Sequence, residues 1–148
     1  MARGGCELAG ERWPGGAPLV VLLHEGVSDR RGWREVAGRL APRVTVIAYD
    51  RRGYGESPAG SASFTHVDDL LAILDRERAA RAWLVGASAG GGLALDTALL
   101  APDRVAGLVL IGTAVSGAPP TAPLRIAAYG LVPNALSGQC TGLQTSGT

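Results

Sequence analysis

The stretch "WLVGASAGGG" (residues 83–92) sets a single serine among small residues, directly after a short apolar run. A serine on an ordinary surface loop needs no such neighbours. A serine on a sharp turn with a strained backbone does need them, because bulky side chains on either side would not fit. The stretch therefore predicts that Ser88 is a nucleophile, held where a strand turns into a helix.

The chain around this serine alternates between two hydrophobic patterns. Short apolar runs without polar alternation, which are typical of strands buried on both faces, occupy residues 18–25, 43–50, 82–88 and 105–113. Helical patterns lie between them, at residues 30–40, 65–80 and 90–101. The alternation predicts an α/β fold: a mostly parallel sheet with flanking helices and right-handed crossovers.

The pattern at residues 65–80 is the clearest of the three helices. Apolar side chains recur at i, i+3, i+4 and i+7, namely Val67, Leu70, Leu71 and Leu74. Charged residues fill the other face, as in an amphipathic helix. Thr65 is followed three residues later by Asp68, which resembles a capping box and predicts that the helix begins here.

Length and composition predict one globular domain. The chain has 148 residues, of which 47% are hydrophobic, enough for one packed core. We assign that core to residues 18–116, after an N-terminal segment (residues 1–17) with only a weak strand candidate at 6–13. Residues 117–148 are Pro-rich at first and carry no charge from 126 onward, so we expect a disordered tail.

Charge and apolar runs exclude several classes of partner. The net charge is +1, and all 14 basic residues are scattered arginines, which argues against a nucleic-acid partner. No apolar run approaches the roughly 18 residues of a membrane span, and the start lacks a signal peptide, so we expect a cytoplasmic protein. Cys6 and Cys140 have no metal-type spacing and are interpreted as free thiols. We predict no metal and no cofactor.

The nucleophile interpretation rests on a G-x-S-x-G motif made by Gly86, Ser88 and Gly90. One alternative is a plain Gly-rich turn. Another is a dinucleotide site, because Gly86, Gly90 and Gly92 also fit a G-x-x-x-G-x-G spacing. Such a site usually follows the first strand and needs an acid at the end of the next one. Here the next apolar run ends in "IGT", which favours the nucleophile.

Four motifs in order resemble the N-terminal part of an α/β-hydrolase: "VVLLHEGVSDRRGW", "YDRRGYGESP", "LVGASAGG" and "PDRVAGLVLIGT". The resemblance implies that Ser88 is the nucleophile and that the amides of Ala89 and Gly26 form the oxyanion hole. It also implies a small-molecule acyl substrate such as an ester or lactone. Glu25 departs from the family, which usually has a small residue there, and we expect its carboxylate to point away from the oxyanion.

The resemblance gives structural roles to other polar residues. The family's histidine at the position of His24 shapes the oxyanion loop without transferring protons. His66 falls in the first turn of a helix, so we expect neither histidine to be the general base. Asp50 and Arg52 are expected to brace the loop that follows their strand.

A serine nucleophile needs a histidine base and an acid that orients it, and in this fold they follow the serine in the order acid, then histidine. After Ser88 the only acids are Asp96 and Asp103, and no histidine follows His66. We therefore expect a truncated α/β-hydrolase fold whose acid and base belong to a missing C-terminal half, and which is inactive alone. The alternatives are a non-catalytic fragment or binding module, and a dinucleotide-binding domain.

Overall fold

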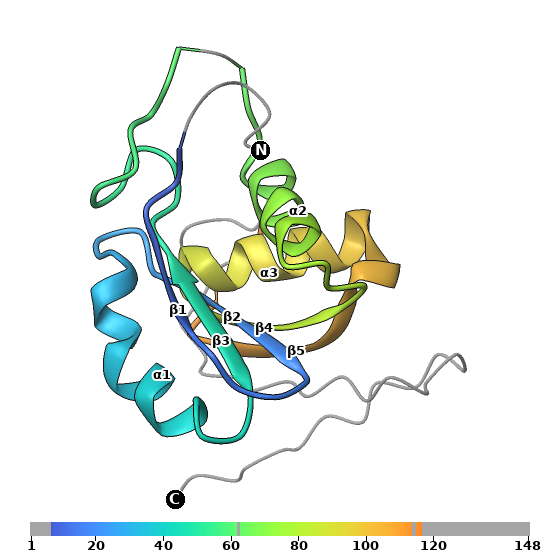
Figure 1. Ribbon diagram of the computed structural model, residues 1–148. Helices are drawn as coiled ribbons and strands as arrows, with labels where there is room; N and C mark the ends of the chain where they lie inside the picture. Colours follow the sequence, from blue (N-terminus) through green and yellow to red (C-terminus); the bar gives the residue numbers. More distant parts are fainter. Residues whose placement is uncertain (1–6, 62, 114, 117–148) are drawn as a thin grey trace, which may run out of the picture.

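The computed structural model describes residues 7–61, 63–113 and 115–116 (Figure 1). The strands of this part form one sheet in the order β1-β3-β2-β4-β5. Their bounds are β1 Gly10–Trp13, β2 Leu19–Leu23, β3 Thr45–Tyr49, β4 Ala82–Ala87 and β5 Val105–Ile111. β1 runs antiparallel to β3, and the other pairs are parallel. The mostly parallel sheet predicted from the apolar runs is confirmed, and the weak strand candidate contributes β1 at the sheet edge.

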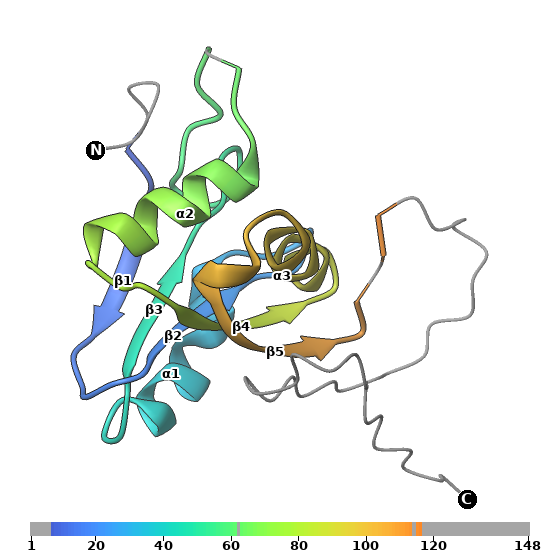
Figure 2. The same cartoon turned by 90° about the vertical axis from the view of Figure 1, so that its right-hand side faces the viewer.

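Helices cover both faces of this sheet. They are α1 (Arg34–Leu40), α2 (His66–Arg76) and α3 (Ala89–Leu100), and short 3₁₀ turns precede α1 (Arg30–Trp33) and β5 (Pro102–Arg104). Figure 2 shows α2 and α3 on one face and α1 on the other. None of the helices in the described part of the chain is long and apolar enough to cross a bilayer.

The core has two layers because β2 buries alternate side chains on opposite faces. Leu19, Val21 and Leu23 pack with leucines of α2 and α3. Val20 and Leu22 pack with Ala37 of α1 and with Trp33 of the turn before it. This double burial explains why the strand reads as a continuous apolar run rather than an alternating one.

The helix predicted at residues 65–80 is shorter than expected at its C-terminal end. It begins as predicted, with the Thr65 side chain accepting a hydrogen bond from the Asp68 amide at 3.0 Å. It ends at Arg76, because Arg78 takes a left-handed conformation (φ 55°) and the Ala79 amide turns back to the Leu74 carbonyl. This turn redirects the chain toward β4. The sequence has no glycine or proline here that would have predicted the end of the helix.

The order of the strands places a topological switch point between β2 and β4. The chain leaves β2 for β3 on one side and later returns to β4 on the other side. In open α/β sheets, ligands bind outside the carboxyl ends of the strands at such a switch point. The segments that follow β2 and β4 at this point contain Gly26 and Ser88.

Candidate active site

Ser88 forms the turn between β4 and α3, as the sequence predicts. It is the N-cap residue of α3, with φ 49° and ψ −115°. Its amide donates to the carbonyl of Ile111 at 2.8 Å, and its carbonyl accepts from the Gly92 amide at 3.1 Å. A non-glycine residue at positive φ costs of order 1–3 kcal/mol and persists only where the surroundings enforce it. The strain of this turn is therefore concentrated on the serine itself.

The glycines that flank Ser88 are required by close packing within the protein. A Cβ atom on Gly86 would lie 2.4 Å from the carbonyl oxygen of Gly90. A Cβ atom on Gly90 would lie 2.2 Å from the carbonyl oxygen of Leu23. Helix α3 thus begins in direct contact with the ends of β4 and β2. This packing accounts for both glycines without a bound pyrophosphate.

The two residues expected to supply the oxyanion hole lie side by side. A Cβ atom on Gly26 would be 3.6 Å from the Cβ of Ala89, an ordinary van der Waals contact. Gly26 follows β2, and Ala89 is the first residue of α3. The switch point between β2 and β4 therefore brings together Gly26, Ser88 and Ala89, although Gly26 and Ala89 are 63 residues apart in sequence.

His24 is fully buried and has both ring nitrogens engaged. Its Nε2 accepts a hydrogen bond from the Arg51 amide at 3.1 Å, so Nδ1 carries the proton that it shares with the Glu25 carbonyl at 2.7 Å. Burial lowers the pKa of His24 below its usual range, which keeps the ring neutral. The imidazole fixes the loop after β2 and has no nitrogen available to take a proton from Ser88.

Asp50 braces the loop after β3, as expected. Its buried carboxylate accepts from the amides of Arg30 at 2.8 Å and Glu56 at 2.9 Å, and it pairs with the Arg30 guanidinium. Gly55 has φ 50°, and a Cβ there would lie 2.2 Å from the Asp50 carboxylate. Sequence analysis missed Arg30, which comes from a segment 20 residues earlier.

Arg52 has the bracing role predicted for it, and its partner is Asp69 of α2. The guanidinium donates two hydrogen bonds to that carboxylate, both at 2.8 Å, and both side chains are buried. The pair ties the loop after β3 to the helix that covers the sheet.

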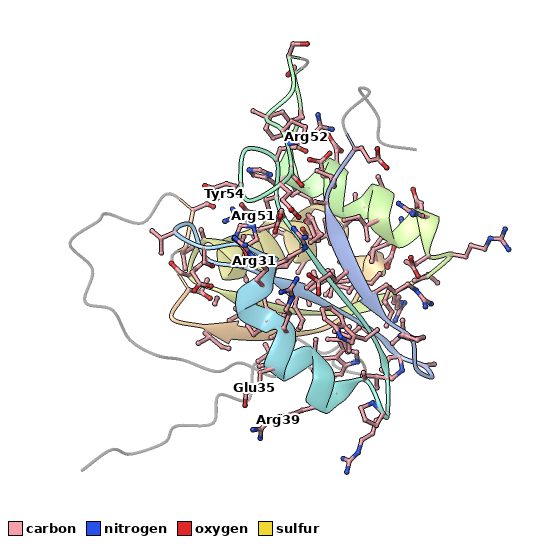
Figure 3. All side chains as sticks on the ribbon, turned by 60° about the vertical axis from the view of Figure 1, so that its left-hand side comes forward. Arg31, Glu35, Arg39, Arg51, Arg52 and Tyr54 are labelled. Carbon is pink, nitrogen blue, oxygen red and sulfur yellow. The ribbon has the colours of Figure 1, made fainter. Side chains whose placement is uncertain are left out.

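Arg51 is a further residue that sequence analysis missed. Only 4% of its surface is exposed, and its guanidinium lies 4.5 Å from the centre of the Tyr54 ring (Figure 3). One of its terminal nitrogens donates to the Glu25 carbonyl at 3.2 Å. The sequence motif predicts roles for the neighbouring Asp50 and Arg52, but no pattern in the sequence points to the residue between them.

A cavity of about 400 Å³ opens next to the serine turn. Its walls come from Arg51, the start of α2 (residues 65–67), the first turns of α3 (Ala89 to Asp96) and residues 115–116. His66 lines it, and burial lowers the pKa of this imidazole. The volume suits a small molecule or part of one. Within the described ranges, no group of three or more His, Cys, Asp or Glu side chains could hold a metal ion.

The acids that follow Ser88 are not arranged as triad members. Asp96 lies on α3 and accepts a hydrogen bond from the Ser116 hydroxyl at 3.0 Å. Asp103 lies in the turn before β5, at the amino ends of the strands, whereas Ser88 follows the carboxyl end of β4. Among residues 7–61, 63–113 and 115–116, no hydrogen bond joins either acid to a histidine.

Comparisons with known proteins agree with this geometry. Residues 18–137 match the family described as alpha/beta hydrolase fold. The chain is 44% identical over 115 residues to the dihydrolipoyllysine-residue acetyltransferase component of the acetoin cleaving system of Pseudomonas putida, covering 75% of this chain and 30% of that protein. It is 41% identical over 106 residues to 2-hydroxymuconate semialdehyde hydrolase of Pseudomonas sp. (strain CF600), covering 67% and 37%.

Among solved structures, one described as Est816, an N-acyl homoserine lactone degrading enzyme, superimposes with a TM-score of 0.71 at 30% identity. The match covers 78% of this chain and 47% of that one. The chain thus spans less than half the length of each of these three proteins. These matches agree with the order of the strands and with the serine turn at the switch point. The chain belongs to the alpha/beta hydrolase fold family.

Proposed function

We propose that the chain carries the nucleophile and the oxyanion hole of a serine hydrolase that acts on an ester, lactone or similar acyl substrate. The observation that carries this proposal is the conformation of Ser88, which is held at positive φ at the N-terminus of α3, one residue before Ala89 and close to Gly26. Relatives named as a semialdehyde hydrolase and a lactone-degrading enzyme support the reaction class.

The proposed chemistry follows from the positions of these groups. The Ser88 oxygen attacks the carbonyl carbon of the substrate, while its proton passes to a base. Negative charge develops on the carbonyl oxygen, which accepts hydrogen bonds from the amides of Ala89 and Gly26. Each such donor contributes about 2.7–4 kcal/mol to the transition state. The positive end of the α3 dipole favours the same charge.

The cavity beside Ala89 is the proposed site for the rest of the substrate. Its walls combine the apolar Val67, Leu93 and Val115 with the polar Thr65 and His66. A mixed lining of this kind holds an acyl chain by contact and orients it with few polar groups. We propose a small-molecule substrate, no cofactor and a cytoplasmic location.

The acid and base are proposed to come from sequence that this chain lacks. His24 is fully occupied by its hydrogen bonds, and within the described ranges no hydrogen bond joins Asp96 or Asp103 to a histidine. Loss of a triad histidine has cost about 10⁶-fold in turnover in a serine protease, more than two oxyanion donors are expected to supply. We therefore expect the chain alone to show little or no turnover of an ester substrate.

The proposal is tested by restoring the missing groups. Residues 1–113 are fused to the C-terminal half of an α/β-hydrolase that contains both acid and histidine, and hydrolysis of a p-nitrophenyl ester is followed. General base catalysis alone predicts a gain of about 10²–10⁴-fold over the unfused chain. Ser88→Ala should remove the gain, whereas Ser61→Ala, an exposed serine, should leave it. A folded fusion in which Ser88→Ala hydrolyses the ester as fast as its parent would refute the nucleophile assignment.

A further inference from the structure

We infer that Arg51 is a positioning residue that aims the Gly26 amide into the oxyanion hole, an inference that rests on the proposed function. Arg51 does not touch the reacting atoms. It acts through the peptide that joins Glu25 to Gly26.

The Glu25 carbonyl is the anchor of this peptide. It accepts two hydrogen bonds, from His24 Nδ1 at 2.7 Å and from the Arg51 guanidinium at 3.2 Å. In a trans peptide, the C=O and N–H groups lie in one plane and point in opposite directions. Because the carbonyl is held toward His24 and Arg51, the Gly26 N–H faces the other way. Two donors on one oxygen therefore set the direction of the proposed oxyanion donor.

Within the described part of the chain, side-chain packing adds little restraint to the loop at this point. Val27, the next residue, is 97% exposed, and Gly26 has no side chain to pack. A glycine backbone samples more conformations than that of any other residue, so its amide is poorly oriented unless its neighbours restrain it. An oxyanion donor is effective only when it is aligned before the charge develops. The hydrogen bonds to the Glu25 carbonyl supply that restraint.

Arg51 is itself held rigidly enough for this task. Its guanidinium lies over the Tyr54 ring at 4.5 Å, and its own amide binds His24 Nε2 at 3.1 Å. The same Tyr54 ring meets His24 edge-on, with centroids 5.2 Å apart. The Arg51 side chain thus donates to the Glu25 carbonyl directly, and the Arg51 backbone amide fixes the imidazole that makes the second hydrogen bond. A planar guanidinium can stack and donate at once, which a lysine ammonium does less well.

The sequence offers a way to observe this one peptide. Glu25–Gly26 is the only Glu-Gly pair in the chain. A sample labelled with carbonyl-¹³C glutamate and ¹⁵N glycine therefore gives a single cross-peak in an HNCO spectrum, from the Glu25 carbonyl and the Gly26 amide. The whole chain is compared with Arg51→Met, Arg51→Lys and Arg43→Met. Arg43 is an exposed arginine with no ion pair among the described residues and serves as the matched control.

The second measurement reports on the oxyanion hole. Phenylboronic acid is added, and its boron forms a bond to the Ser88 oxygen as the hydroxyl proton leaves to solvent. The product is a tetrahedral boronate anion, one of whose oxygens occupies the oxyanion position. Binding should shift the Gly26 amide in the parent chain and leave it unchanged in Ser88→Ala.

We expect Arg51→Met to move the Glu25 carbonyl resonance upfield, to broaden the Gly26 amide, and to weaken boronate binding by about tenfold or more as one donor loses alignment. Arg51→Lys should restore part of each effect, and Arg43→Met should match the parent. If Arg51→Met does not fold, Tyr54→Leu removes the stacking ring and Tyr54→Phe keeps it, so only the former should reproduce the changes.

Unchanged Glu25 and Gly26 resonances in a folded Arg51→Met or Tyr54→Leu chain would overturn the inference, whatever the boronate does. Altered resonances with unaltered boronate affinity would also overturn it, because the peptide would then move without consequence for the hole. If the parent chain binds no boronate through Ser88, the proposed function fails. The carbonyl signal then still shows whether Arg51 holds the peptide, so the two failures are distinguishable.

Discussion

The backbone of Gly90 packs against the carbonyl of Leu23 so closely that a Cβ atom on Gly90 would lie 2.2 Å from the Leu23 oxygen. The contact joins the first turn of α3 to the end of β2, and so sets the distance between Ser88 and the segment that contains Gly26. It also predicts how the stability of the chain changes when a methyl group is added at Gly90.

Gly90→Ala should destabilise the chain, because the three atoms nearest to the methyl group all belong to the backbone of Leu23 and His24 and cannot swing away. Overpacking of this kind costs about 1–3 kcal/mol, and occasionally more. The matched control is Gly38→Ala in α1, where nothing lies within 4 Å of the new Cβ. That change should stabilise the chain by about 0.5–1 kcal/mol through helix propensity. Urea unfolding followed by circular dichroism measures both, and equal effects would contradict the packing argument.

Ser88→Gly should stabilise the fold even though it removes a side chain. The φ of 49° and ψ of −115° are strained for serine and accessible to glycine. Relief of the strain, less the greater freedom of glycine in the unfolded chain, should give a net gain of about 1 kcal/mol. Ser88→Ala keeps the Cβ atom and should give no such gain. A thermal melt that ranks alanine at or above glycine would show that the turn is not strained by its side chain.

Arg52→Met should be strongly destabilising, because it leaves the Asp69 carboxylate buried without its bidentate partner. Breaking a buried pair from one side costs about 3–5 kcal/mol, whereas exposed pairs contribute about 1 kcal/mol or less. The control is Arg39→Met in the pair with Glu35 on α1, where both side chains are 79% exposed (Figure 3). The double variant Arg52→Met/Asp69→Leu should recover much of the loss. Similar urea midpoints for the two arginine variants would exclude a stabilising role for the buried pair.

The stability of the chain should fall as the pH drops below 6.5. Burial lowers the pKa of both His24 and His66 in the folded chain below the usual 6.5. Between the folded pKa and 6.5, the unfolded chain binds protons that the folded chain does not, so acid favours unfolding. For His24 the loss is at most about 1.4 kcal/mol per pH unit across this window. Above about pH 6.5, protonation of these two histidines should no longer change the stability.

Urea midpoints at pH 7.5 and 5.5 check this expectation. His66→Asn removes one of the two groups and should reduce the difference between the midpoints without removing it. A midpoint that is the same at both pH values in the parent chain would mean that both imidazoles protonate freely in the folded state.

The strands could be predicted from the sequence because burial on both faces leaves a continuous apolar run, as in residues 18–25. The turn at Ser88 could be predicted because the glycines that its close packing requires stand beside it in the sequence. The end of α2 could not, since Arg78 adopts a left-handed turn that its side chain does not favour. Arg30 and Arg51 were missed for a different reason: their partners, Asp50 and the Glu25 carbonyl, lie 20 and 26 residues away, and no periodicity records such contacts.

The hydrogen bond from the Ser88 amide to the Ile111 carbonyl couples the serine turn mechanically to β5. Ile111 is the last residue of that strand, and within the described residues β5 pairs with β4 alone. A strand added along its other side would stiffen Ile111, and through one hydrogen bond it would stiffen the backbone that carries the hydroxyl. Adding a strand next to β5 would then also make the backbone at Ser88 more rigid, because the two are joined by this hydrogen bond.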